Sequence, residues 1–152
     1  MIACPSVTPE DGGAQKVLQD TLADLGFSCH SQTFSADNTP DVRNLYARLG
    51  SASPNFCFAG HTDVVPVGDP DSWQDDPFGA EVKDGVLYGR GASDMKTAIA
   101  CFAEATSRFL ANHGSDFGGS ISFLITGDEE GPAINGTRKL LEWAKAEGEV
   151  LD

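Results

Sequence analysis

The sequence predicts an α/β fold, a sheet with helices on its faces, and two observations predict it. Expected strands occupy 27–34, 44–49, 55–59 and 120–126, the first two from moderate alternation and 55–59 from a short apolar run, and they alternate with segments of helical periodicity at 14–25, 95–113 and 137–146. Such alternation is typical of a sheet covered by helices. The chain has 152 residues and 40% of them are hydrophobic, so we expect one domain with a substantial core.

The elements of the first half follow from local signals. Thr8-Pro9-Glu10-Asp11 is expected to start the first helix, because threonine is a good helix cap, proline suits the first turn and acidic residues favour the positive end of a helix. The strand at 55–59 is a short apolar run, so we expect it to be buried on both faces. The stretch 66–79 is rich in Pro, Gly and Asp and is expected to be a loop.

The middle of the chain contains a hairpin signal. Two alternating runs flank Asp84-Gly85, a favoured two-residue turn. Trp73 is expected to anchor the preceding loop, with packing against a substrate as the alternative. The Gly89-Arg90-Gly91 triplet that follows is only GxG and lacks the Gly-Lys-Ser/Thr ending of a phosphate loop.

Charge and composition exclude several classes of partner. Ten Lys and Arg against 23 Asp and Glu give a net charge of −13, which repels nucleic acid and anionic lipid. No apolar stretch approaches the roughly 20 residues of a membrane span, and the first residues do not have the pattern of a signal peptide. The 4 cysteines form no CxxC pair, and nothing indicates a disulfide framework. We therefore expect a cytoplasmic protein without nucleic-acid or membrane partners.

Three groups of polar side chains follow apolar elements and are candidates for a site: His61-Thr62-Asp63, Asp94 and Asp128-Glu129-Glu130. Ligands of open α/β sheets bind at the carboxyl ends of strands, which is where the first and third groups stand. The distances along the chain leave room for all three groups to converge. No GxSxG nucleophile motif occurs, and none of the cysteines has a nearby histidine suited to act as its base.

Each group also has an ordinary structural explanation. A histidine at a strand end is more often structural, Asp94 can cap the helix after it, and two glutamates can form a solvated loop. Adjacent carboxylates repel, however, so burying Glu129 and Glu130 together requires a nearby cation. One imidazole with several carboxylates suits Zn²⁺, Co²⁺ or Mn²⁺. If the strand stays extended, Asp63 points the same way as His61 and can orient its imidazole.

Four stretches carry a resemblance to a known family: SVTPEDGGAQ, FAGHTDVVPVGD, SWQDDPFGAEVKDGVLYGRGASDMK and TGDEEGPAINGT. They resemble the co-catalytic zinc peptidases and deacylases, the family of acetylornithine deacetylase, aminoacylase and carboxypeptidase G. The resemblance extends over about residues 6–143. It implies the catalytic domain of that family, a mixed sheet with helices on both faces, and metal-dependent hydrolysis of the amide bond of an N-acyl amino acid.

The resemblance also implies a role for each candidate residue. His61 would bind one zinc ion, Asp94 would bridge two zinc ions, and Glu130 would bind the second, with Co²⁺ able to replace zinc. Glu129 would be the general base, and Asp63 would support His61. The peptide bond after Asp94 would be cis.

The wording of the motifs further implies a substrate. SVTPED and GPAxxGT favour the branch that releases succinate from N-succinyl-L,L-2,6-diaminopimelate, a small molecule of lysine and cell-wall precursor synthesis. A deacetylase, an aminoacylase or a carboxypeptidase is the alternative within the family. A non-catalytic metal-binding or interaction fragment is the alternative outside it.

The resemblance implies that residues 1–152 are the N-terminal portion of the catalytic domain. In the family a further acidic ligand, a final histidine ligand and an inserted dimerisation domain lie beyond this stretch, and the full-length proteins form homodimers. We therefore expect a truncated chain with little activity of its own.

Overall fold

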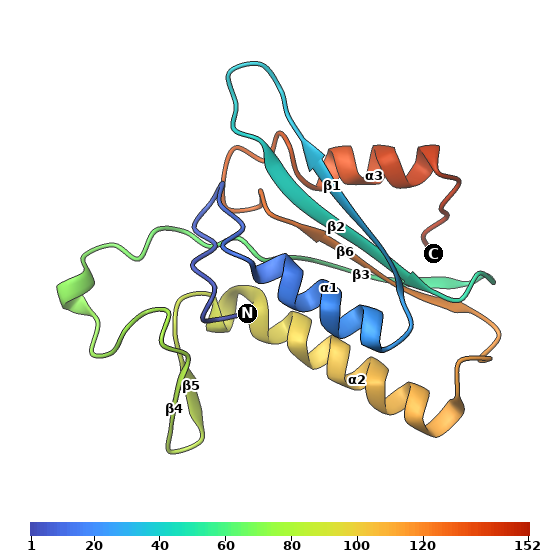
Figure 1. Cartoon of the computed structure of the whole chain (residues 1–152), viewed down its shortest axis with the longest axis horizontal. Helices are drawn as coiled ribbons and strands as arrows, with labels where there is room; N and C mark the ends of the chain where they lie inside the picture. Colours follow the sequence, from blue (N-terminus) through green and yellow to red (C-terminus); the bar gives the residue numbers. More distant parts are fainter.

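A mixed sheet of four strands lies at the centre of the fold. The computed structural model describes all residues, 1–152. The strand order is β1-β2-β6-β3 (Figure 1). β1 (Ser28–Phe34) pairs antiparallel with β2 (Val42–Leu49), and β2 pairs antiparallel with β6 (Ser120–Thr126). β3 (Asn55–His61) runs parallel to β6, so β3 and β6 end at the same edge of the sheet.

Helices cover both faces of the sheet, as predicted. α1 (Ala14–Asp24) and α2 (Thr97–His113) lie on one face, and α3 (Thr137–Ala146) lies on the other (Figure 1). Successive strand residues point to opposite faces, so each central strand supplies two cores. Leu45, Ala47, Phe123 and Ile125 pack with residues of α1 and α2, while Tyr46 and Leu124 pack with Leu140 of α3.

The start of α1 differs from the prediction. The helix begins at Ala14 rather than near Thr8, and its N-cap residue is Gly13, which has no side chain to cap it. The Asp11 carboxylate accepts hydrogen bonds from the backbone N–H groups of Gly13 and Gln15, both at 3.1 Å. The predicted start was wrong because Asp11 offers two acceptor oxygens to the free N–H groups of the first turn.

The burial of β3 also differs from the prediction. β3 is an edge strand with β6 as its single neighbour, and Phe56 on it is 62% exposed. Its apolar composition therefore does not mean burial on both faces. An apolar run predicts a strand, but its place in the sheet is fixed by its neighbours, which local sequence does not contain.

A long excursion separates β3 from α2 and stands away from the sheet (Figure 1). It contains the single turn η1 (Pro70–Ser72) and a hairpin of β4 (Glu81–Lys83) and β5 (Val86–Tyr88), whose strand residues are all exposed. The turn is the predicted one, since Asp84 and Gly85 have φ values of 52° and 79°. No helix of the chain has the length and apolar character needed to cross a membrane.

Candidate metal centre

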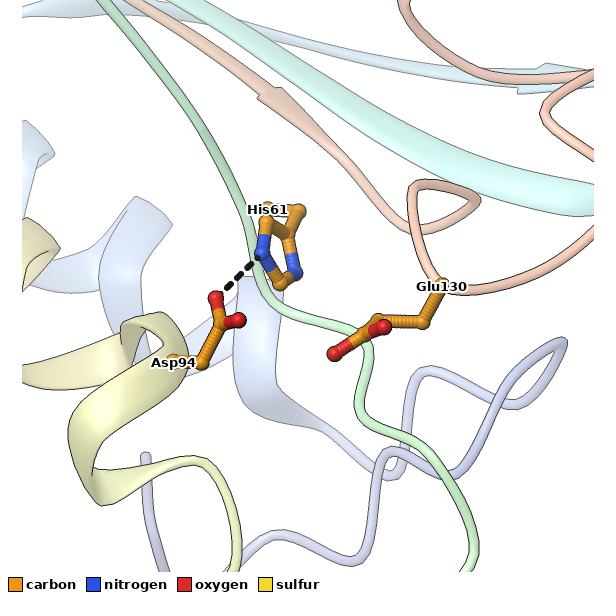
Figure 2. A group of neighbouring side chains, drawn as sticks. All are labelled: His61, Asp94 and Glu130. Carbon is orange, nitrogen blue, oxygen red and sulfur yellow. Dashed lines mark hydrogen bonds and ion pairs between the residues drawn. The ribbon is translucent and has the colours of Figure 1, made fainter.

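The carboxyl ends of β3 and β6 bring two of the three polar groups together. His61 pairs with Thr126 as the last residues of the two strands, and the N–H of Thr62 donates to the carbonyl of Thr126 at 3.0 Å. His61 is thus held at the end of β3, and the loop that carries Glu130 leaves β6 beside it. Figure 2 shows these two side chains pointing toward a common space with Asp94.

Asp94 reaches this space from an irregular turn. η2 (Ala92–Lys96) precedes α2, and Asp94 within it has φ −131° and ψ 102°, which are extended rather than helical values. The Asp94–Met95 peptide bond is cis, as the family resemblance implies. The Asp94 carboxylate does not cap α2; its Oδ1 lies 2.9 Å from Nε2 of His61 (Figure 2).

The structure places the candidate ligands around one point. One ligand atom each of His61, Asp94 and Glu130 lies within 4.8 Å of the others. Glu129 stands at the rim, with its Oε2 3.8 Å from Nε2 of His61 and its side chain 57% exposed. All three sequence-predicted ligands and the predicted base are therefore neighbours in space.

Asp63 lies behind this group and contacts two of its members. The backbone carbonyl of Asp63 is 3.0 Å from Nδ1 of His61, and its carboxylate Oδ1 is 3.6 Å from the same nitrogen. The other carboxylate oxygen accepts a hydrogen bond from the backbone N–H of Glu130 at 2.8 Å. The sequence suggested that Asp63 orients His61; the structure adds that Asp63 also positions Glu130.

The electrostatics of the group favour a cation. Burial alone lowers the pKa of His61, but the carboxylate and carbonyl of Asp63, together with Asp94, raise that pKa to about 9. Burial raises the pKa of Glu130, and the charges of Asp94, Glu129 and Asp63 add to the rise against the opposing effect of His61. Positive charge in the centre stabilises these ionised carboxylates.

The donor set fits a divalent metal ion. One imidazole nitrogen and two carboxylates form the nitrogen and oxygen set of a zinc, cobalt or manganese site. Three protein ligands with one open position are typical of a catalytic zinc site. If two ions bound here, they would have to share Asp94, and each ion would have only one further ligand from this chain.

Two buried charged residues lie near the centre: Lys96, which the sequence did not single out, and Asp128, which it placed in the third polar group without a role of its own. Lys96 is fully enclosed, and its Nζ donates to the carbonyls of Met1 and Cys4, which fixes the N-terminal segment under η2. Asp128 is also buried, and it accepts a hydrogen bond from the backbone N–H of Asn135 at 2.8 Å. That bond closes the loop carrying Glu129 and Glu130, so the loop is not simply a solvated acidic segment.

The sequence pattern of peptidase family M20/M25/M40 matches residues 57–152. The chain belongs to this family. The match includes His61, Asp94, Glu129 and Glu130, and it contains three of the four sequence stretches that carry the family resemblance.

Three comparisons place the chain among its relatives. Succinyl-diaminopimelate desuccinylase of Methylorubrum populi is 62% identical over all of this chain, which spans 39% of the length of that relative. Human carnosine dipeptidase 1 is 31% identical with a TM-score of 0.79 over 95% of this chain and 33% of its own. An M20 family metallo-carboxypeptidase of Sulfolobus solfataricus shares the fold, with 22% identity and a TM-score of 0.81 over 98% of this chain and 33% of its own.

Proposed function

We propose that this chain is part of a zinc-dependent amidohydrolase that releases succinate from N-succinyl-L,L-2,6-diaminopimelate. The observation that carries the proposal is the convergence of His61, Asp94 and Glu130, with Glu129 beside them. The identity of 62% with a protein named succinyl-diaminopimelate desuccinylase supports the choice of substrate. The products of the reaction would be succinate and L,L-diaminopimelate, and the diaminopimelate would serve lysine synthesis.

The proposed roles follow from the positions of the side chains. His61, Asp94 and Glu130 would hold the zinc, with Asp94 shared if two ions bind. Bound zinc would lower the pKa of a water molecule and polarise an amide carbonyl. Glu129 would take the proton of the attacking water and pass it to the departing amine, a role that suits an exposed carboxylate at the rim. Asp63 would hold the imidazole of His61 and the backbone of Glu130 in place.

The proposal extends to organisation and surroundings. We propose that residues 1–152 form the N-terminal portion of the catalytic domain, and that the remaining ligands and the homodimer contacts come from residues outside this stretch. Co²⁺ would replace zinc in the same donor set. The strongly negative charge disfavours nucleic acid and anionic membranes as partners. We propose the cytoplasm as its location, where the four free cysteines would stay reduced.

Two other functions are compatible with the same residues. A related N-acyl amino-acid deacylase, such as an acetylornithine deacetylase, aminoacylase or carboxypeptidase, would use the same metal centre. A non-catalytic metal-binding fragment is favoured by the number of ligands, because two ions sharing Asp94 would each have only one other ligand from this chain.

The test combines metal content with succinate release. Two proteins would be purified: the 152-residue chain, and a longer polypeptide that contains this chain and matches its relatives in length. Both would be loaded with zinc and given N-succinyl- and N-acetyl-diaminopimelate. We expect zinc-dependent succinate release by the longer polypeptide, abolished by Glu129→Gln, and little by the 152-residue chain. Faster hydrolysis of the acetyl substrate would favour a deacetylase. Zinc binding without hydrolysis by the longer polypeptide would favour the non-catalytic function.

A further inference from the structure

The Gly89-Arg90-Gly91 triplet, which the proposed mechanism does not use, lines the same cavity as the metal centre. This cavity has a volume of about 310 Å³, and Asp94 and Glu130 lie in its wall. Arg90 is the single basic residue among those that line it. The other two charged residues of this lining, Asp94 and Glu130, are acidic.

The backbone of Arg90 is held tightly by its two glycine neighbours. Gly89 has φ 153° and Gly91 has φ 80°, and a Cβ at these positions would lie 2.5 Å from Ile2 and 2.7 Å from Val64. Side chains are therefore excluded on either side of Arg90. The N–H of Arg90 also donates to the carbonyl of Pro77 at 2.7 Å, so the position of its Cα is fixed.

The guanidinium of Arg90 is held without a carboxylate. Its Cζ lies 5.3 Å from the ring centroid of Trp73, and the indole N–H of Trp73 donates to the carbonyl of Val67 at 2.9 Å. Nη2 of Arg90 donates to the carbonyl of Pro66 at 3.3 Å, which is the one hydrogen bond of the side chain. Trp73 is thus the predicted loop anchor, and its ring also supports the arginine.

None of the ion pairs of the chain involves Arg90, although the chain contains 23 acidic residues and only 10 Lys and Arg. A guanidinium that is stacked on an aromatic ring, bonded to one carbonyl and free of carboxylates keeps donors for another anion. The carboxylates of the metal centre would repel an anionic substrate, and Arg90 offsets that repulsion at one end of the cavity.

We propose that Arg90, supported by Trp73, binds a carboxylate of the substrate and selects acyl groups that end in a carboxylate. This inference rests on the proposed function, because it assigns the succinyl end of the substrate to the wall of the same cavity. A guanidinium can bind a carboxylate with two parallel hydrogen bonds, whereas a neutral acyl end gains nothing from it. Arg90 is accordingly a specificity residue.

The test compares succinate with succinamate, in which one carboxylate is replaced by a neutral amide. Binding of each to the 152-residue chain would be followed by NMR titration at constant ionic strength, with and without zinc. We expect the wild-type chain to prefer succinate by about tenfold or more, in line with charge-assisted hydrogen bonds. Arg90→Gln should bring the preference close to one, and Arg90→Lys should retain part of it.

The matched control is Arg108→Gln, which removes the same charge from an exposed helix position paired with Glu104. It should leave the preference for succinate unchanged. Equal preference in the wild type and in Arg90→Gln would overturn the inference, as would no preference in the wild type. Thermal unfolding of each variant checks that folding is retained. Zinc content, measured on the same samples, tests the metal centre separately, so failure of the proposed function is distinguishable from failure of the Arg90 assignment.

Discussion

The metal centre has a buried half and an exposed half, and the two are built differently. The side chains of His61 and Asp63 are 7% and 1% exposed, and both are fixed by contacts within the protein. The side chains of Asp94 and Glu129 are 73% and 57% exposed. Asp94 contacts His61 alone, and Glu129 approaches His61 no closer than 3.8 Å.

The buried half positions the candidate ligands, and the exposed half carries the groups that would react. The buried half sets the direction of the imidazole and the position of the Glu130 backbone, because Asp63 contacts both. The exposed half presents carboxylates that are free to meet a metal ion, a water molecule or a substrate. Substitutions in the buried half should therefore alter folding and metal binding together, whereas those in the exposed half should alter metal binding or turnover and leave folding nearly unchanged.

The largest expected effect separates the two adjacent glutamates. In a zinc-loaded polypeptide that turns over, Glu129→Gln should lower kcat by about 10²–10⁴-fold and keep its zinc, because the base is removed while the ligands remain. Glu130→Gln should instead lose zinc affinity first. Metal content and kcat would be measured on the same preparations. Loss of zinc from Glu129→Gln, with normal zinc and rate in Glu130→Gln, would reverse the two assignments.

The next largest effects are expected from an Asp→Asn substitution made once in each half, at Asp63 and at Asp94. Asp63→Asn should lower zinc affinity by about 10–100-fold and the free energy of unfolding by about 1–3 kcal/mol, since it weakens contacts to His61 and Glu130. Asp94→Asn should also weaken zinc binding, but the exposed site should leave the unfolding free energy within about 0.5 kcal/mol. Urea unfolding and chelator competition measure both quantities. Equal destabilisation by the two variants would remove the distinction between the halves.

The pH dependence of zinc binding tests the environment of the buried half. The pKa of His61 is about 9, above its ordinary value of 6.5, so the metal-free imidazole is protonated at neutral pH. Zinc binds neutral imidazole, so binding releases this proton, and apparent affinity should rise by up to about tenfold per pH unit until pH 9. Calorimetry in two buffers of different ionisation enthalpy should detect about one released proton at pH 7.5.

The same shift has a consequence for the metal-free fold. A pKa raised in the folded state stabilises the fold below pH 6.5, and this contribution is lost as the pH rises through about 9. Asp63→Asn is the control, because loss of its charge should move proton release to lower pH. Zinc binding at pH 7.5 without proton release would contradict the assigned environment of His61.

The smallest effect is expected in the excursion between β3 and α2. Val82 lies in β4 with 66% of its surface exposed, so Val82→Ser should change the free energy of unfolding by no more than about 0.5 kcal/mol. Phe123→Ala, in the core beneath α1 and α2, is the contrast and should cost about 3–5 kcal/mol. A large loss from Val82→Ser would show that the hairpin packs against other parts of the protein.

The sequence predicted most elements because their signals are local. Apolar runs, the Asp84-Gly85 turn and helical periodicity marked strands, hairpin and helices, and the strand-end rule pointed to His61 and Glu130. The predictions that failed depended on neighbours. β3 lies at the edge of the sheet although Phe56 is apolar, and α1 begins at Ala14, where the Asp11 carboxylate bonds the backbone of the first turn, although Thr8 is also a good cap.

Parts of the site could not be predicted for the same reason. The link from Asp63 to the N–H of Glu130 joins residues far apart in the chain, and nothing local marks it. The stacking of Arg90 on Trp73 likewise joins two loops. The glycines beside Arg90 were visible in the sequence, but they indicate a tightly packed backbone without naming its partner.

X-ray absorption of the zinc-loaded 152-residue chain tests most directly whether His61, Asp94 and Glu130 bind metal. We predict one tightly bound zinc ion, with one imidazole nitrogen and otherwise oxygen neighbours at about 2.0–2.2 Å. His61→Ala should remove the imidazole signal. No tight zinc, zinc bound equally well by His61→Ala, or sulfur at about 2.3 Å from one of the cysteines would contradict the account.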